Sequence, residues 1–412
     1  MSPADSLPAA AAPSLSVERP AAAWSNVVLA ALLMLATLPG RTQGMGLITE
    51  PLLRELQLDR VLYANINLWA TLLGAAFCLP AGWLIDRFGL RWTSAGIVLL
   101  LAAAVWGLSA MQGALFLLFA LVLLTRALGQ SALSVASITA VGKSFGGRVG
   151  WAMGVYSVLL SVFFAGAFVA VGAVVRNQGW RPAWALVALG LVLVAALVVI
   201  LFHEPLRPTQ TRTAPPTGLP LSAALRTRLF WVFAGATALF GLASSGIGLF
   251  NEAILAERGF DQQTFHTFLA VSTLCALAGQ MLCGWLSRSR PMPRLLAMAM
   301  FLYAGGLAAL PNLHTHTQLW IFAAVFGVAA GFIAVIFFAA WRQTFGRAHL
   351  GRIQGAAQML TVLASALGPL LFAQCHAAAG SYAPLLYTLA PILFGAGFIA
   401  WRIKPVPPRC LA

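Results

Sequence analysis

Gly82-Trp83-Leu84-Ile85-Asp86-Arg87-Phe88-Gly89-Leu90-Arg91 ends one long apolar run, Leu68 to Leu84, and precedes another, Thr93 to Leu108. Charged residues between two apolar runs of membrane length predict a tight turn at the boundary between lipid and water. Gly82 and Gly89 permit a sharp reversal of the backbone, and Asp86 can pair with an arginine or cap a neighbouring helix. The stretch therefore indicates a chain that crosses a membrane more than once.

The composition of the whole chain agrees with a membrane environment. Of its 412 residues, 60% are hydrophobic and only 8% are charged. This number of charged groups is too small to cover the surface of a soluble protein of this length. Most of the surface must therefore be apolar and in contact with membrane lipid. The formal net charge of +15 would suit nucleic acid, but the basic residues stand singly between apolar runs. Without a basic patch, a nucleic-acid partner is excluded.

Apolar runs of membrane length, bounded by charges, prolines or glycines, predict twelve spanning helices and an all-α membrane protein. The expected spans are 25–48, 63–85, 92–111, 114–142, 150–175, 182–202, 229–256, 262–286, 294–311, 318–342, 351–376 and 382–402.

A polar stretch divides these spans into two sets of six. Residues 203–228 carry five prolines and several threonines, which predicts a flexible cytoplasmic linker. Gly82-Trp83-Leu84 recurs as Gly284-Trp285-Leu286, which indicates two pseudo-symmetric six-helix bundles. The expected units are a disordered cytoplasmic tail (1–23), an N-terminal bundle (24–202), the linker (203–228), a C-terminal bundle (229–402) and a cytoplasmic tail (403–412).

The positions of lysine and arginine indicate the orientation. If the N-terminus is cytoplasmic, five of the 25 basic residues fall in outer loops, two (Arg41 and Arg126) fall within helices, and the others face the cytoplasm. Loops rich in basic residues stay in the cytoplasm. We therefore expect both termini there, in a bacterial-type inner membrane.

The Asp86-Arg87-x-Gly89-x-Arg91 spacing resembles the signature loop between helices 2 and 3 of the major facilitator superfamily of secondary transporters. The resemblance implies two bundles that rock about a site near the middle of the membrane. It also implies that this loop and a weaker counterpart near Arg288 latch the outward-open state. The expected latch residues are Gly82, Asp86, Arg87, Gly89, Arg91 and Arg288.

A finer resemblance is to the monocarboxylate and oxalate-formate branch of that superfamily. It rests on Val141 to Gly154, which contains Lys143 and Arg148, and on Gly179-Trp180-Arg181. It implies a small organic anion as the substrate and a carboxylate-binding cation in helix 8. The expected helix 8, residues 262–286, contains no lysine or arginine. Either a cation of the other bundle takes that role, or the substrate is another anion, such as nitrate.

Arg41 is the candidate for that cation. It follows Val27 by about 14 residues, or roughly 21 Å of helix, which places it inside a hydrocarbon layer of roughly 30 Å. Pro39 and Gly40 predict a broken helix there, and a break frees backbone groups for a ligand. Two interpretations stay open: an anion-binding arginine in a central cavity, or an arginine that reaches the outer rim or pairs with Glu50.

Further polar residues of the spans are candidates for binding and coupling. Arg126, midway along helix 4, could bind substrate, relay charge to a carboxylate or hold the structure together. Glu252 is the candidate for proton coupling, with an ordinary outer-loop glutamate as the alternative. The expected substrate-binding residues are Arg41, Gln43, Arg126, Gln130, Tyr156, Gln280 and Gln358. Amides and hydroxyls also hold membrane helices together, so each of them has a packing alternative.

The sequence thus predicts a monomeric secondary transporter that moves a small anionic solute by alternating access, with protons or by exchange. A nitrate-like inorganic anion carrier and a multidrug or metabolite exporter are the alternatives. No cofactor or metal is expected, because the five cysteines form no C-x-x-C pair. An enzyme is not expected either, because no nucleophile elbow, phosphate loop or metal-spacing motif occurs.

Overall fold

The computed structural model describes residues 20–144, 149–203, 219–345 and 350–403, and these residues form helices and no strand. The predicted all-α class is confirmed. The N-terminal half contains α1 (Pro20–Leu35), η1 (Leu38–Gly40), α2 (Thr42–Leu56), α3 (Arg60–Ala75), α4 (Cys78–Phe88), α5 (Leu90–Ala110), α6 (Leu115–Thr125), the π-helix η2 (Arg126–Leu133), α7 (Ser134–Ser144), α8 (Val149–Gln178) and α9 (Trp180–Leu201). The C-terminal half contains α10 (Leu221–Leu225), α11 (Arg228–Ala256), α12 (Gln262–Leu286), α13 (Met292–Ala309), η3 (Leu310–Asn312), α14 (His316–Phe345), α15 (Leu350–Ala379) and α16 (Ala383–Arg402).

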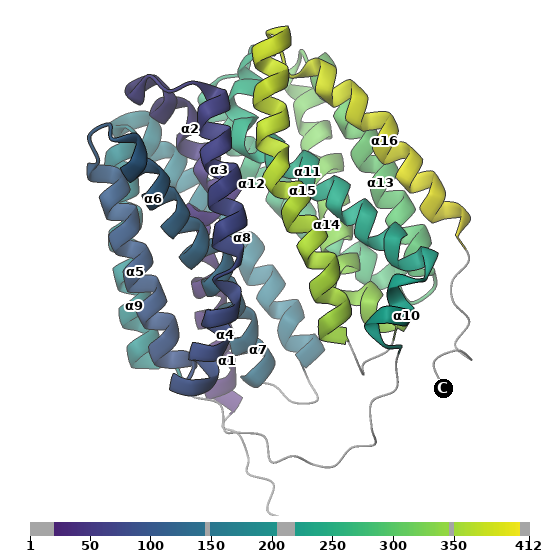
Figure 1. Cartoon of the computed structure of the whole chain (residues 1–412), viewed down its shortest axis with the longest axis horizontal. Helices are drawn as coiled ribbons and strands as arrows, with labels where there is room; N and C mark the ends of the chain where they lie inside the picture. Colours follow the sequence, from purple (N-terminus) through teal and green to yellow (C-terminus); the bar gives the residue numbers. More distant parts are fainter. Residues whose placement is uncertain (1–19, 145–148, 204–218, 346–349, 404–412) are drawn as a thin grey trace, which may run out of the picture.

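Eleven helical segments of the described chain are long and apolar enough to cross a membrane. The remaining predicted span, 63–85, consists of α3 and α4, which follow one another across a short turn at Ala76 and Phe77 and form one column in Figure 1. Each of these two helices is too short to cross a membrane alone. This span therefore differs from the prediction by being broken.

The first predicted span, 25–48, is too short at both ends. α1 begins at Pro20, inside the predicted tail 1–23, and η1 and α2 continue the span to Leu56. We call this broken span, residues 20–56, helix 1. Leu52 and Leu53 are buried because α2 packs on α11 of the other half. Residues expected in an outer loop therefore belong to the contact between the halves.

Polar side chains fix where several helices begin. The Asp59 carboxylate accepts hydrogen bonds from the backbone N–H groups of Val61 and Leu62 at the start of α3. Asp261 accepts from the Thr264 N–H at the start of α12, at 2.8 Å. Hydrogen bonds from Thr264 also hold the pKa of the Asp261 carboxyl below its ordinary value. Such caps stabilise a helix by about 0.5–2 kcal/mol.

The turn between α4 and α5 is the reversal that the sequence predicts. Gly89 joins the two helices with φ of +84°, a conformation that side chains other than glycine rarely adopt. Arg91, at the start of α5, donates a hydrogen bond to the carbonyl of Val199 in α9. The turn is thereby attached to the last helix of its own half.

The predicted flexible linker, 203–228, is partly folded. Leu221–Leu225 form α10, and the backbone N–H of Leu219 donates to the carbonyl of Phe345 at 3.0 Å. Ala224 is fully buried. The apolar residues at the end of the linker therefore pack on the C-terminal half. Residues 204–218, the two tails outside 20–403, and residues 145–148 of the branch motif lie outside the described chain.

The two halves stand side by side in Figure 1, the N-terminal half in purple to blue and the C-terminal half in green to yellow. They meet where α2 packs on α11, α3 on α15 and α8 on α12. We call the end that carries the turn between α2 and α3 the distal end. The opposite end, where His203 and Leu219 flank the linker, is the linker end.

Glycines allow the closest approach between the halves. A Cβ atom at Gly46 of α2 would lie only 2.2 Å from the carbonyl oxygen of Gly248 in α11. Any larger residue at position 46 would therefore push the two helices apart. The distal half of helix 1 is thus held directly against the other half of the molecule.

Candidate functional site

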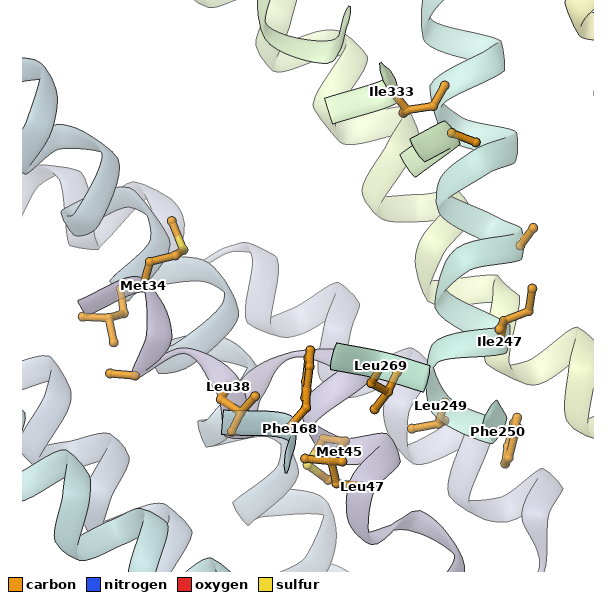
Figure 2. Packing of buried hydrophobic residues seen from close by; sticks show 14 of the residues in the cluster. Met34, Leu38, Met45, Leu47, Phe168, Ile247, Leu249, Phe250, Leu269 and Ile333 are labelled. Carbon is orange, nitrogen blue, oxygen red and sulfur yellow. The ribbon is translucent and has the colours of Figure 1, made fainter. Parts of the chain in front are cut away.

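A cavity of about 290 Å³ lies between the two halves. Helix 1 and α8 line it from the N-terminal half, and α11, α12 and α14 line it from the C-terminal half. Figure 2 shows four of its apolar lining residues, Leu38, Phe168, Ile247 and Leu269, near the junction of the halves. Its polar lining residues are Arg41, Gln43, Ser161, Ser244, Asn251, Ser272, Thr273 and Gln280, and its aromatic ones are Phe164, Phe168, Phe268 and Phe326.

Helix 1 is broken beside this cavity, as Pro39 and Gly40 predict. α1 ends at Leu35, and Arg41 has extended backbone angles (φ −88°, ψ 151°) before α2 begins at Thr42. Gly40 is pressed against the π-helix, since a Cβ atom there would lie 2.2 Å from the carbonyl oxygen of Thr125. Arg41 stands at this break and lines the cavity, while its guanidinium reaches back to Met34 of α1 and to Thr37.

Arg41 is the one charged residue among the described residues that line the cavity. Its Nε donates to the Thr37 hydroxyl at 2.6 Å, and its Nη2 lies 2.8 Å from the sulfur of Met34 and 3.5 Å from the Ser134 hydroxyl. The Phe164 ring lies 5.6 Å from the guanidinium carbon. Among the described residues, no carboxylate pairs with Arg41 and no acceptor binds its Nη1. The Nη1 group of Arg41 can therefore donate hydrogen bonds to a ligand.

The alternative partner of Arg41, Glu50, is engaged elsewhere. Both carboxylate oxygens of Glu50 accept hydrogen bonds from Arg60, at 2.7 and 2.8 Å. Glu50 is only 5% exposed, so this bidentate pair is largely shielded from water. A pair between Arg41 and Glu50 is excluded in this structure.

Arg126 is enclosed by protein atoms and does not line the cavity. It is 2% exposed, and its Nη1 donates to the Gly40 carbonyl, the Thr42 hydroxyl and the Gln130 amide oxygen at 3.2, 3.0 and 2.9 Å. Its Nη2 donates to the Asn67 amide oxygen at 2.7 Å. Arg126 thus fastens both sides of the break in helix 1 to α3 and to the π-helix η2. This arrangement favours the structural interpretation of Arg126 and Gln130.

The other predicted binding residues fall into two groups. Gln43 and Gln280 line the cavity. Tyr156 is buried and shares a 2.7 Å hydrogen bond with Ser137, while Gln358 is exposed, and neither is among the lining residues. A substrate role for Tyr156 and Gln358 stays a prediction without support from this geometry.

Several lining residues were not among the predicted site residues, although a periodic signal marks them. On α12, Phe268, Ser272, Ala276 and Gln280 follow one another at intervals of four residues, which places them on one helix face. Hydroxyl and amide groups on a single stripe of an apolar helix indicate a polar cavity. Asn251 also lines the cavity and is not among the predicted site residues, because the prediction for this part of α11 rests on the neighbouring charge of Glu252.

Side-chain hydrogen bonds join the two halves at the distal end. Arg60 of α3 donates to the Tyr382 hydroxyl at 2.8 Å, in addition to its pair with Glu50. On the other side of the molecule, Arg176 of α8 lies 2.8 Å from Nδ1 of His266 in α12. Both contacts must break if the halves separate at this end.

Replacing Tyr382 with phenylalanine is expected to loosen the distal closure. The change removes one hydrogen bond between the halves, so the population open at the distal end should rise roughly 2- to 12-fold. Double electron–electron resonance measures the distance between the halves at this end. The spin labels are attached through Leu62→Cys and Ala378→Cys, with the native cysteines replaced. Tyr387→Phe is the matched control, since that hydroxyl bonds Asn312 within the same half. An unchanged distance distribution in Tyr382→Phe would show that this bond does not hold the halves.

Glu252 lies near this closure, on α11 and next to the cavity residue Asn251. It is half-buried within the helix, so the outer-loop alternative is wrong. Its Oε1 accepts a hydrogen bond from Gln262 at 3.1 Å, whereas no described residue donates to its buried Oε2. The carboxyl group is therefore only partly satisfied.

The predicted latch lies at the linker end and is described only in part. The Arg87 guanidinium stacks on the Trp83 and Phe88 rings of its own helix, and Arg288 follows the end of α12. The side chain of Asp86 lies outside the described part of the chain. The latch role of Gly82, Asp86, Arg87, Gly89, Arg91 and Arg288 therefore stays a prediction.

Many membrane-length helices, two halves and a shared cavity whose described lining carries one cation, Arg41, are typical of one class of protein, the secondary transporters. The family model of the Major Facilitator Superfamily matches residues 29–369 and, in a second match, residues 233–410. The chain belongs to this superfamily and is a membrane transporter of small-molecule solutes, not an enzyme. No curated protein matches the chain.

Solved transporters share the fold. A bacterial homologue of the human lysosomal transporter Spinster, inward-facing and occupied, is 14% identical over 95% of this chain and 99% of its own, with a TM-score of 0.74. The nucleoside transporter NupG is 14% identical over 92% of this chain and 99% of its own, also with a TM-score of 0.74. At such low identities the similarity shows the fold alone. The substrate and the assignment to the monocarboxylate branch stay predictions.

Proposed function

We propose that this transporter moves a small organic monoanion, resembling a monocarboxylate, across a bacterial-type inner membrane by alternating access. The observation that carries the proposal is the placement of Arg41. It is the one charged residue of the cavity lining, it stands at the break of helix 1, and no described carboxylate neutralises it. An arginine within the membrane is costly unless a partner or water compensates it, so a bound anion would stabilise this site.

The sign of the charge separates this proposal from its alternatives. A neutral substrate would leave the guanidinium without a counter-charge, and a lipophilic cation would be repelled by it. None of the described residues that line the cavity carries a carboxylate that could attract a cation. An exporter of lipophilic cations is therefore disfavoured. An inorganic anion such as nitrate would pair with Arg41 but has no apolar surface to bury against the apolar walls of the cavity.

The distal contacts support a transport cycle in which the described state is closed at the distal end. Opening that end would break the bonds of Arg60 and Arg176 across the halves. The predicted latch at the linker end would then form and close the opposite side. With both termini in the cytoplasm, the described state would face inward. A monomer suffices, because both halves of the cavity come from one chain.

A thermal-shift screen of the purified protein tests the proposed substrate class. Benzoate, acetate and nitrate represent anions, and tetraphenylphosphonium represents lipophilic cations. A ligand at 100 times its Kd stabilises the folded state by about 2.7 kcal/mol, so a binding anion should raise the unfolding temperature. If tetraphenylphosphonium alone stabilises the protein, the anion proposal is wrong.

We further propose that Glu252 carries the coupled proton. Its unpartnered oxygen and its position beside Asn251 put an ionisable group between the cavity and the distal closure. Glu252→Gln should abolish accumulation driven by a pH gradient in proteoliposomes and leave substrate exchange intact. Glu55→Gln, at the exposed distal surface, is the control and should leave both assays unchanged. Gradient-driven uptake that survives in Glu252→Gln would assign coupling to another group.

A further inference from the structure

We infer that the cavity selects an amphipathic monoanion: an anionic group at Arg41, a flat ring between the phenylalanines, and an uncharged polar group that reaches the C-terminal half. This inference rests on the proposed function for the charge. It adds the ring and the uncharged polar group of the substrate, and the reason why these parts matter for transport. The volume of about 290 Å³ stands at the lower end of small-molecule sites, which suits a single substituted ring.

The charged end accepts one anionic group and no more. Thr37 and Met34 occupy Nε and Nη2 of Arg41, which leaves Nη1 as the donor without a described partner. The next arginine, Arg126, lies outside the cavity, and both of its terminal nitrogens, Nη1 and Nη2, donate to protein acceptors. A second negative charge would find no cation among the lining residues, so dianions are excluded by the cost of burying an unpaired charge.

The walls of the cavity are preorganised for a flat apolar body. Phe164 and Phe168 of α8 stand together, with ring centroids 6.0 Å apart. Across the cavity, Phe268 stacks on Phe322 at 5.6 Å with an interplanar angle of 6°, and Phe326 packs against the same Phe322 at 5.2 Å. Because Phe322 supports both rings from behind, their orientation is fixed before a ligand arrives. Aromatic walls of this kind favour a stacked ring over a small hydrated anion.

The C-terminal side of the cavity offers hydrogen bonds without charge. No described residue bonds the side-chain amides of Asn251 and Gln280, although both line the cavity. The hydroxyls of Ser272 and Thr273 donate to the Leu269 carbonyl and so present lone pairs to a ligand. These groups suit a hydroxyl or amino substituent on the ring.

The two ends of such a ligand would touch different halves. The anionic group binds the N-terminal half through Arg41, and the polar group binds α11 and α12 of the C-terminal half. A ligand that makes both contacts favours the state in which the halves close over it, because it binds that state more tightly. A ligand with the charge alone binds one half and drives the cycle less well.

Isothermal titration calorimetry and counterflow in proteoliposomes test this with 4-hydroxybenzoate, benzoate, nitrate, terephthalate and the neutral 4-hydroxybenzamide. We expect 4-hydroxybenzoate to bind at least about tenfold more tightly than nitrate, because ring burial adds to the charge. The same margin is expected over terephthalate, because its second carboxylate would be buried without a cation. Benzoate should bind within a few-fold of 4-hydroxybenzoate yet support slower counterflow. Phe164→Leu should weaken 4-hydroxybenzoate binding roughly 2- to 12-fold, and more than it weakens the binding of acetate, which has no ring.

The outcomes separate this inference from the proposed function. Equal binding of nitrate, terephthalate and 4-hydroxybenzoate would overturn the ring selectivity and leave the anion proposal standing. Equal counterflow of benzoate and 4-hydroxybenzoate would overturn the bridging of the halves. Binding of 4-hydroxybenzamide as tightly as 4-hydroxybenzoate would overturn the proposed function itself. These ligand comparisons use the unmodified chain, so they hold even if Phe164→Leu fails to fold.

Discussion

Arg41→Gln is expected to lower substrate affinity and transport roughly 30-fold or more. The cation lines the cavity and has no described acidic partner, so a bound anion would depend on it. Removing one member of a desolvated charge pair costs about 2–5 kcal/mol, which sets this lower bound. Uptake of the best-stabilising anion by proteoliposomes, at equal amounts of folded protein, gives the measurement.

The control for Arg41→Gln is Arg402→Gln. Arg402 is exposed at the end of α16 and stacks on Phe398, far from the cavity lining. The same loss of a positive charge should leave transport unchanged there. Arg41→Lys should restore part of the affinity, because it keeps the charge and loses the planar donor edge. Full transport by Arg41→Gln would remove Arg41 from the substrate site.

Gly46→Ala is expected to force the distal end open. The new Cβ atom would lie 2.2 Å from the Gly248 carbonyl oxygen, so α2 and α11 must separate. Overpacking of this kind costs about 1–3 kcal/mol, which converts to a shift of about 5- to 150-fold between two states. Alanine is a better helix former than glycine, so α2 itself should not be weakened. Transport should fall because the distal closure forms less often.

The spin-label pair on Leu62→Cys and Ala378→Cys measures the opening caused by Gly46→Ala. Gly166→Ala on α8 is the matched control, because no atom lies within 4 Å of the Cβ position there. We expect longer distances for Gly46→Ala and the original distances for Gly166→Ala. Unchanged distances in both variants would mean that the approach of Gly46 to Gly248 does not limit the closed state.

The features that the sequence predicts well depend on local chemistry. Pro39 and Gly40 weaken a helix wherever they occur, so the break before Arg41 could be predicted without knowledge of the fold. The reversal at Gly89 follows in the same way from a glycine between charged residues. The number of crossings follows from apolar runs of membrane length, although the break between α3 and α4 was not visible in an apolar stretch.

The partners of the buried charges could not be predicted, because they come from distant parts of the chain. Arg126 bonds Asn67, 59 residues away, and Gly40, 86 residues away. The same limit applies to Tyr156, because the sequence does not show that its hydroxyl shares a hydrogen bond with Ser137. On a helix that is apolar on all sides, the sequence does not show which face a single polar residue occupies.

The distal closure was missed for a related reason. Glu50 closely follows the predicted span 25–48, so the sequence offers it as a partner of Arg41 in that span, but the structure pairs it with Arg60. That pair forms because helix 1 extends to Leu56 and returns through a short turn into α3. The position of a helix end, which is the least certain feature of a sequence prediction, thus decided which arginine was available.

The central claim is that Arg41 binds an anionic substrate in the cavity between the halves. The most direct measurement is an experimental structure of the protein with the anion that gives the largest thermal shift. We predict its carboxylate or equivalent oxygen within hydrogen-bond distance of Arg41 Nη1, about 2.7–3.2 Å, with its body against Phe164. An anion bound at Arg126, or one held in the cavity without contact to Arg41, would contradict the account.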